Sequence, residues 1–430
     1  MAKLLVFSFS GFSDQNANGK TLKALLNQWK PEELAQFYCG AEPQDFGFCH
    51  RYFHVTDGAM VKALLGKRAS RVRNLSDDAV HQRNTIVAPA AGGTGVPSFL
   101  RKHNYNFFLR SLRETLWCIS PWGRGEFRQW VRDFSPDAIF YMVGESRFMD
   151  KLVMNTAKDL DVPVILYNAE AYRIVDVTKR KGMDKRFYQT VERSYKQLRG
   201  MAGLVIYNCE YLKDAYAALY GDDKNAMVAY NAASFDTEAY CNNDAPLSLV
   251  YFGNLGVGRV PSLIELSEVL GSIDSALMLD VYGKATEENE LLLKQANHIR
   301  FHGLVEPAAL VGIKQRADIL IHAESFDEDI MPKLKYAFST KLAQYLAAGR
   351  CTLSYAPAET ASTQYLLRED CALVATTLIE LKDRLSRAVQ NASVREEYAQ
   401  KALETARKNH DLTATGQELV KKIEGVLHER

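Results

Sequence analysis

Short apolar runs that alternate with helical segments restrict the fold of this chain more than any other feature. Ala138 to Val143 reads as a buried strand, Arg147 to Leu160 as a helix and Val162 to Tyr167 as a second strand. The same alternation returns at Leu204 to Tyr207 and again from Leu247 onward. Strands joined through helices run parallel, and the helices cover both faces of their sheet. The sequence therefore predicts an α/β protein built from doubly wound parallel sheets.

The domain organisation follows from the length and from one break in this pattern. The chain has 430 residues, enough for two domains with separate cores. A polar, irregular stretch interrupts the alternation before it restarts near Leu247. We predict an N-terminal domain over residues 1–235, a linker over 236–247, a C-terminal domain over 248–408 and a terminal helix over 409–430.

Composition excludes several classes of protein. The 53 basic and 52 acidic residues nearly balance, so no overall positive field indicates a nucleic-acid partner. The seven cysteines are scattered without metal-type spacing, which is typical of a reduced, cytoplasmic chain. We interpret Cys39, Cys49, His50 and His54 as buried residues in preference to a metal site. The N-terminus reads as a first strand and not as a signal peptide, and no apolar run is long enough to span a membrane.

The stretch from Ala317 to Ala356 carries the clearest chemical signal. It reads as a buried strand, an acidic loop, a helix and another strand. Ser339 or Thr340 can cap the helix, and Gly349 supplies a left-handed end. The first turn then presents backbone N–H groups, two hydroxyls and the ammonium of Lys341 at one point. This arrangement predicts a site for an anion, and the natural anion is a phosphate.

Three parts follow one another in this stretch: A-D-(apolar)3, an acidic loop and S-T-K-x-x-x-Y-L-A-x-G. This pattern resembles the nucleotide-sugar end of GT-B fold glycosyltransferases. The resemblance is to the large family (glycosyltransferase family 4-like) of retaining enzymes that build bacterial polysaccharides and lipid-linked glycans. It covers the C-terminal domain well and the N-terminal domain only as a pattern. It implies two Rossmann-like domains that face a central cleft, with the donor on the C-terminal domain and the acceptor on the N-terminal one. Family members also send their terminal helix back to the N-terminal domain.

Typical members of this family carry two glutamates at the donor site. The second lies five residues before the closing glycine of the helix, and Gln344 stands at that position. An amide can still hydrogen-bond the ribose diol, although it adds no charge. The first glutamate, which would bind sugar hydroxyls, is displaced because the acidic loop is longer than usual. Glu324 is its first candidate and Asp327 its second, ahead of Glu328 and Asp329.

A glycine-rich turn follows the strand that begins at Leu247. Gly253, Gly256 and Gly258 stand in the order G-x-x-G-x-G, which is not the dinucleotide fingerprint and gives little support to a Rossmann dehydrogenase. The resemblance makes this turn the diphosphate loop, in which Arg259 neutralises the leaving nucleoside diphosphate. The same resemblance implies further donor contacts at Asn254, Gly283, Lys284, Leu304, Val305, Ser339 and Thr340.

Candidate acceptor residues follow strands of the N-terminal domain. Gly19 lies in the first loop, which ends in Gly-Lys-Thr; we reject a P-loop because Asp14 stands where that motif needs glycine. Glu145 and Glu170 come directly after two other strands, where ligands of parallel sheets bind. Capping of the next helix is the alternative role for these two carboxylates.

Two basic segments could contact anions. Residues 101–132 interleave arginine and lysine with tyrosine, phenylalanine and tryptophan, which suits peripheral contact with an anionic membrane at its inner face. Packing of these aromatic residues into the domain core is the alternative. Residues 178–199 are also basic and read either as a solvated helix face or as a site for an anionic acceptor.

The sequence thus predicts a cytoplasmic glycosyltransferase of the hexosyltransferase type. It would move a sugar from a nucleoside-diphosphate sugar to a hydroxyl of a glycan or lipid-linked glycan, with retention. No metal is required, because Arg259, Lys341 and the helix terminus already supply positive charge. One alternative is a GT-B fold nucleotide-sugar epimerase. The other is a non-catalytic sugar-nucleotide binding subunit, for which the missing second glutamate is the best argument.

Overall fold

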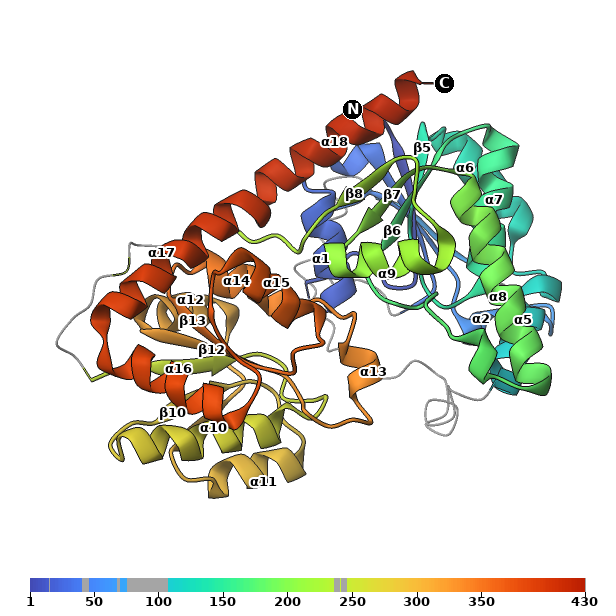
Figure 1. Ribbon diagram of the computed structural model, residues 1–430. Coiled ribbons are helices and arrows are strands. Elements are labelled where there is room, and N and C mark those ends of the chain that lie inside the picture. The colour runs from blue at the N-terminus through green and yellow to red at the C-terminus, as the bar shows by residue number, and fades with distance from the viewer. Residues whose placement is uncertain are drawn as a thin grey trace. The chain divides into compact units, whose positions relative to one another are not determined.

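The protein divides into two compact units, which are described separately. The computed structural model describes residues 1–14, 16–40, 46–67, 70–75, 107–235, 240 and 246–429. Unit 1 comprises Met1–Ala229 and Gly416–Arg430, and unit 2 comprises Tyr230–Thr415 (Figure 1). The linker predicted at 236–247 lies mostly outside the described residues.

Unit 1 is built on an eight-stranded sheet with the order β4-β3-β2-β1-β5-β6-β7-β8. Its strands are β1 Leu4–Ser8, β2 Leu34–Tyr38, β3 Arg51–His54, β4 Arg71–Asn74, β5 Ala138–Met142, β6 Val164–Asn168, β7 Ala202–Tyr207 and β8 Ala226–Val228. All neighbours pair in parallel except β4, which runs antiparallel to β3 at the edge. Every residue of β1, β5 and β6 is buried, as expected for strands that are covered on both faces.

The helices of unit 1 cover this sheet. They are α1 Ala17–Leu25, η1 Pro31–Glu33, α2 Asp57–Ala63, α5 Phe107–Ile119, α6 Arg124–Phe134, α7 Arg147–Leu160, η2 Val177–Lys179, α8 Gly182–Gly200 and α9 Glu210–Tyr220. The terminal helix α18, Leu412–His428, begins in unit 2 and ends in unit 1. Its Leu419, Ile423 and Val426 are part of the hydrophobic core of unit 1.

Unit 2 contains a six-stranded, wholly parallel sheet with the order β11-β10-β9-β12-β13-β14. Its strands are β9 Leu249–Phe252, β10 Leu279–Tyr282, β11 Ile299–Gly303, β12 Ile319–Ala323, β13 Cys351–Tyr355 and β14 Leu373–Ala375. Its helices are α10 Arg259–Ile273, α11 Glu287–Gln295, α12 Pro307–Arg316, α13 Met331–Leu334, α14 Thr340–Ala347, α15 Ala361–Glu369, α16 Leu378–Gln390 and α17 Ala392–Asn409. The sheet order reverses between β9 and β12, so the ends of these two strands form the topological switch point where α/β proteins bind ligands.

The aromatic residues of segment 101–132 pack into unit 1 wherever the structure describes their side chains. Trp117, Trp122, Phe127 and Trp130 are each at most 4% exposed. The ring of Phe127 lies edge-on to that of Phe53 in β3, with 5.3 Å between the centroids. Residues 101–106 lie outside the described part of the chain. The packing alternative therefore holds for these four rings, which are buried and cannot make the predicted contact with a membrane in this conformation.

No helix in the described part of the chain is sufficiently long and apolar to cross a bilayer.

Candidate functional site

The glycine turn after β9 begins where three strand ends of unit 2 meet. The N–H of Gly253 donates to Tyr282 O at 2.9 Å, and the N–H of Gly283 donates to Gly303 O at 2.8 Å. The ends of β9, β10 and β11 are thereby tied together by backbone hydrogen bonds. Gly283 has no room for a side chain, because a Cβ there would overlap the carbonyl of Gly253. The predicted donor glycines 253 and 283 thus lie side by side, as the close approach of backbone to backbone requires.

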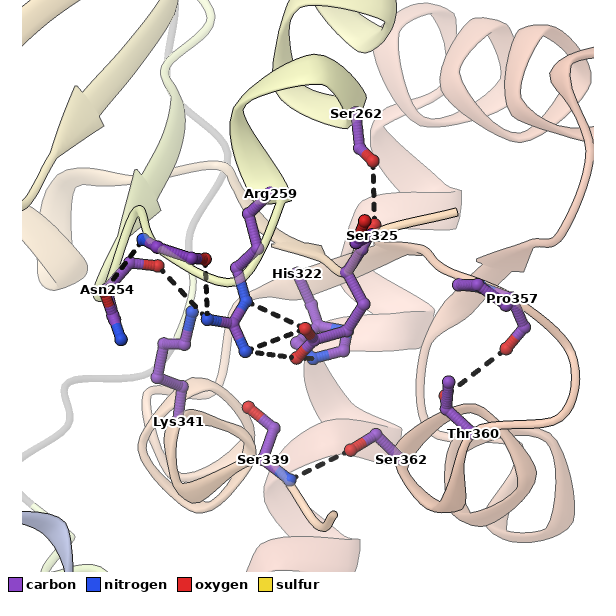
Figure 2. A network of polar contacts seen from close by, with 12 residues as sticks. Asn254, Arg259, Ser262, His322, Ser325, Ser339, Lys341, Pro357, Thr360 and Ser362 are labelled. Atoms are coloured by element: carbon purple, nitrogen blue, oxygen red, sulfur yellow. Dashed lines mark hydrogen bonds and ion pairs between the residues drawn. The ribbon is translucent and has the colours of Figure 1, made fainter. Parts of the chain in front are cut away.

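Arg259 is the first residue of α10, and its guanidinium is held by a carboxylate and by the turn (Figure 2). Its Nε donates to Glu324 Oε2 at 2.8 Å, and its Nη2 donates to Glu324 Oε1 at 3.0 Å. Its Nη1 lies 3.4 Å from Asn254 O and 3.3 Å from Gly256 O. This bidentate pair fixes the plane of the guanidinium at the end of the turn.

Glu324 follows β12 and is 4% exposed. Its backbone is anchored on both sides, since its N–H donates to Tyr355 O at 3.2 Å and Ser262 Oγ donates to its carbonyl at 2.8 Å. Burial raises the pKa of the Glu324 carboxyl, but the His322 imidazole and the charge of Arg259 outweigh burial and hold the pKa at about 2. The carboxylate is therefore ionised at neutral pH.

Lys341 enters the same site from the first turn of α14. Its Nζ donates to Tyr251 Oη at 2.9 Å and lies 4.7 Å from the centre of the Tyr251 ring. Figure 2 shows Lys341 and Arg259 approaching the turn at Asn254 from two helices. Burial and, after it, the charge of Arg259 lower the pKa of Lys341 to about 7, although Glu324 acts in the opposite direction.

The start of α14 differs in detail from the sequence-based expectation. Ser339 is the N-cap residue, but its side chain makes no capping hydrogen bond. The N–H of Ser339 donates to Ser362 Oγ at 2.9 Å, so Ser339 does not offer that group to a ligand as predicted. Thr340 is exposed. Gly349, which follows α14, has a φ of 57°, so it supplies the left-handed end that the sequence predicts. The N–H of Leu342 donates to the carbonyl of the N-cap residue Ser339 at 3.2 Å. The N–H groups of Thr340 and Lys341 precede the first i−4 bond of the helix, so the helix dipole keeps a local positive potential beside Lys341.

Comparisons with known proteins agree with this architecture. Residues 267–421 match the family model described as glycosyl transferase-like. Over 98% of this chain and the whole of the other, the structure resembles Anabaena HepE in complex with UDP, with a TM-score of 0.64 and 12% identity. Sucrose-phosphate synthase from Thermosynechococcus elongatus matches 99% of each chain with a TM-score of 0.59 and 10% identity. α,α-Trehalose 6-phosphate synthase from Burkholderia multivorans matches with a TM-score of 0.58 and 10% identity, over 100% of this chain and 98% of the other. No curated protein sequence matches the chain. The chain has a GT-B fold.

Both Rossmann-like units of the GT-B fold are therefore present.

The remaining predicted donor residues lie in the loop after β12, on α14 and at the ends of β10 and β11. Asp327 is exposed in the loop after β12, where its Oδ1 accepts from the Asp329 N–H at 2.9 Å. Gln344 is exposed on α14 one turn after Lys341. Lys284 and Leu304 are exposed and Val305 is half-buried, at the ends of β10 and β11.

The acceptor-side candidates lie in unit 1. Gly19 lies in the first turn of α1, where its N–H donates to the N-cap Asn16 at 2.7 Å and a Cβ would collide with the backbone of Ser13. Glu145 is held in an ion pair by Arg110. Glu170 is half-buried after β6, and burial raises the pKa of its carboxyl to about 7.

Sequence reasoning missed three residues that shape these sites. His322 and Ser354 lie next to each other on β12 and β13 and are 0% exposed, so no surface pattern marked them. Glu114 of α5 is the third, because its carboxylate accepts from the N–H groups of Arg147 and Phe148 at 2.9 Å and 2.7 Å. Glu114 thus caps α7 from a separate helix, and neither Glu145 nor Ser146 caps it. Only the tertiary structure reveals such a contact.

Acidic residues, histidines and cysteines do not gather into a metal site within the described ranges. No three of them come together in an arrangement that could hold an ion. The exposed carboxylates at positions 327–329 are neighbours in sequence but form no such group in the described structure.

Proposed function

We propose that this protein is a glycosyltransferase that moves a sugar from a nucleoside-diphosphate sugar to a hydroxyl of a glycan or lipid-linked glycan. The observation that carries the proposal is the convergence of Arg259 and Lys341 on the glycine turn at the switch point of unit 2. Two cations and a helix N-terminus at one point are suited to a diphosphate. The GT-B fold and the glycosyl transferase-like match over residues 267–421 support the reaction class.

Uridine diphosphate is the donor nucleotide that we propose. Anabaena HepE, whose fold is similar, was crystallised with UDP, with UDP and glucose, and with UDP-glucose. In this chain the ribose would meet Gln344, and the base would meet backbone groups near Leu304 and Val305, as the resemblance of the donor motif implies.

In the proposed reaction, the bond from the anomeric carbon of the sugar to the diphosphate oxygen breaks. The acceptor hydroxyl bonds to the same face of that carbon, so the configuration is retained, and its proton passes to the departing diphosphate oxygen. Charge develops on the departing diphosphate, and Arg259 and Lys341 stabilise it there. These cations supply the charge that a metal supplies elsewhere, so we propose a metal-independent reaction.

We assign the sugar hydroxyls to the acidic loop. Glu324 was the first candidate for this contact, but both of its oxygens already accept from Arg259. Asp327 is exposed three residues further along and is the better placed carboxylate for a sugar. On the acceptor side, Glu170 and Glu145 remain the proposed contacts, together with the loop that precedes Gly19.

A non-catalytic sugar-nucleotide binding subunit is the second candidate function. Two observations favour it: Gln344 stands where the resembling family has a glutamate, and the carboxylate of Glu324 is engaged by Arg259. Such a subunit would bind the donor without transferring its sugar.

A thermal-shift panel of nucleoside diphosphates and their sugars, without metal, tests the proposal. A ligand at 100 times its dissociation constant adds about 2.7 kcal/mol of stability. UDP or UDP-sugars should stabilise the wild type and should lose this effect in Arg259→Ala and Lys341→Ala. Arg300→Ala and Lys294→Ala are matched controls, because both side chains are exposed cations elsewhere in unit 2. Absence of stabilisation by every nucleotide would refute the proposal.

Turnover separates the two candidate functions. Incubation with the stabilising nucleotide-sugar and a set of glycan acceptors should release free nucleoside diphosphate if the protein is an enzyme. Tight binding with no release for any acceptor would favour the non-catalytic subunit.

A further inference from the structure

A buried chain of polar side chains lies behind Arg259. His322 is on β12, and its Nδ1 lies 2.9 Å from Ser354 Oγ on the paired strand β13. Its Nε2 lies 3.5 Å from Glu324 Oε1, and that carboxylate holds Arg259 in the bidentate pair. His322 and Ser354 are both 0% exposed, so water cannot replace either contact from the surface. Figure 2 shows His322 behind the guanidinium of Arg259.

Hydrogen-bond chemistry determines which ring nitrogen carries the proton. The Nε2 of His322 faces a carboxylate and has no hydrogen-bond partner at closer range in the described structure. A lone pair on Nε2 would repel this carboxylate, whereas an N–H would be attracted to it. Burial lowers the pKa of His322 although Glu324 acts against it, so the ring is neutral and carries one proton. That proton belongs on Nε2, and Nδ1 must then accept from the Ser354 hydroxyl.

We infer that Ser354 and His322 are positioning residues that orient Glu324 and, through it, the guanidinium of Arg259 toward the donor diphosphate. The inference rests on the proposed function for the identity of the anion. The Glu324 carboxylate selects the tautomer with the proton on Nε2, and Ser354 holds the ring in place by donating to Nδ1. His322 fixes one carboxylate oxygen, and Glu324 fixes the fork of Arg259. The separation of 3.5 Å is long for a hydrogen bond, and such contacts shorten when a ligand fills a site.

The chain of contacts explains why a histidine is tolerated in a fully buried strand. An isolated buried imidazole would leave two polar nitrogens without partners, which costs free energy. Here each nitrogen faces a polar group. Nδ1 faces Ser354, and Nε2 faces Glu324, which binds Arg259. A role confined to stability would not require that the second nitrogen face the carboxylate that binds Arg259.

Nitrogen-15 NMR of the histidine rings tests the tautomer without any nucleotide. The His322 resonances are assigned by their loss in His322→Gln. We expect a neutral ring with the proton on Nε2 in the wild type. In Ser354→Ala we expect the same tautomer with a shifted Nδ1 resonance, because Nδ1 loses its hydrogen-bond donor. A ring protonated on Nδ1 in the wild type would overturn the inference, whether or not the protein binds a nucleotide. Absence of nucleotide binding with the expected tautomer would instead count against the proposed function alone.

Affinity for UDP and for uridine tests the effect on the diphosphate. Ser354→Ala and His322→Leu should weaken UDP about tenfold, the loss expected for one hydrogen bond to a charged group. Uridine lacks the phosphates and should bind each variant as it binds the wild type. His322→Gln keeps an N–H donor and should retain most of the affinity for UDP.

Thr352→Val is the matched control, because Thr352 is buried two residues before Ser354 on the same strand and its hydroxyl donates to Arg350 O at 3.4 Å. This variant should bind both ligands normally. Equal losses for UDP and uridine in Ser354→Ala, or an unchanged affinity for UDP in both Ser354→Ala and His322→Leu, would overturn the inference. Thermal unfolding of every variant verifies that it is folded at the temperature of the titration.

Discussion

The side chain of Lys341 fills the space that a side chain at Gly253 would need, at the proposed donor site. A Cβ at Gly253 would lie 2.9 Å from Lys341 Nζ and would overlap the methylene groups behind it. The φ of Gly253 is 142°, a conformation that residues with side chains rarely adopt. Position 253 thus requires glycine for two reasons: its backbone conformation, and the space that the side chain of Lys341 occupies as it reaches the turn.

Gly253→Ala should therefore displace Lys341 and weaken diphosphate binding. We expect a loss of about tenfold in affinity for UDP, the value of one charge-assisted hydrogen bond. Isothermal titration measures it. Gly303→Ala is the control, because Gly303 also has a positive φ of 71° but no atom lies within 4 Å of its Cβ position. If both variants lose affinity equally, backbone strain and not the lysine is responsible.

The pair of Arg259 and Glu324 should make the stability of the protein depend on acid pH. The pKa of Glu324 is about 2 in the folded protein against an ordinary value of 4.5. A depressed carboxyl pKa stabilises the fold above the unfolded value, and this stabilisation is lost as pH falls from about 4.5 to about 2. Glu324→Gln should cost about 3 kcal/mol at pH 7, because it leaves a cation without its partner.

Chemical denaturation of the wild type and Glu324→Gln at several pH values measures this effect. The difference in the free energy of unfolding should shrink between about pH 4.5 and pH 2. A difference that stays constant over this range would show that the carboxylate charge does not stabilise the fold. The double variant Arg259→Met/Glu324→Gln should be more stable than Glu324→Gln alone, because it removes the unpaired charge.

The sequence predicts those features that residues close together in the chain encode, and it does not predict contacts between distant residues. The helix at Arg147–Leu160 has the predicted bounds, and the strand predicted over Ala138 to Val143 spans Ala138–Met142. An amphipathic stripe encodes the helix and a continuous apolar run encodes the strand. Gly19 was predicted to lie in the first loop but lies in α1, Ala17–Leu25, because Asn16 caps this helix.

In the candidate site, too, local motifs predict single residues but not the contacts between distant ones. Arg259 follows the glycine-rich turn and Lys341 stands in the S-T-K motif, and the structure brings both to the turn. The engagement of Glu324 by Arg259 joins residues 65 positions apart, and the contact of His322 with Ser354 crosses 32. Such contacts depend on strand order, which no local pattern specifies. No local pattern predicted the pair of Arg259 and Glu324 for this reason.

Gln344 provides a direct test of the resemblance to the glycosyltransferase family. Gln344→Glu restores the carboxylate at the position five residues before Gly349, and the side chain is exposed, so the change should not disturb the core. A carboxylate accepts hydrogen bonds from the ribose hydroxyls more strongly than an amide. We expect about three- to tenfold tighter binding of UDP and no gain for 2′-deoxy-UDP. Equal gains for both nucleotides would place Gln344 away from the ribose.

The tryptophans should not take part in any contact with a membrane. Trp29, Trp117, Trp122 and Trp130, the four tryptophans of the chain, are at most 5% exposed. Vesicles with anionic headgroups and brominated acyl chains should therefore leave the tryptophan fluorescence unquenched, even if basic residues hold the protein at the surface. Sedimentation with the same vesicles reports binding separately. Quenching by bound vesicles would mean that α5 or α6 rearranges at the lipid surface.

The affinity for a diphosphate should fall as pH rises above neutrality, because Lys341 must be charged to bind it. Its pKa is about 7 against an ordinary value of 10.5, with burial as the largest cause and the charge of Arg259 as the second. Diphosphate binding favours the protonated form, so the pKa is higher in the complex. Affinity is then greatest below the pKa of the free protein and falls by up to about tenfold per pH unit above it. The second phosphate pKa is about 6, so titrations above pH 7 are not affected by ionisation of the ligand.

Lys341→Arg is the matched variant for this prediction. A guanidinium remains charged throughout this range, so its affinity for UDP should be independent of pH between about 7 and 9. Titration calorimetry in buffers of different ionisation enthalpy should also show that the wild type takes up a proton on binding and that Lys341→Arg does not. The groups that interact with Lys341 are Tyr251, Arg259, Glu324 and His322. The pKa of Glu324 is about 2 and burial lowers the pKa of His322, so neither of these two groups changes its charge in this interval. Burial raises the pKa of Tyr251 beyond this range, so the tyrosine stays neutral as well. An identical pH slope in the wild type and Lys341→Arg would assign the titration to a group other than this lysine.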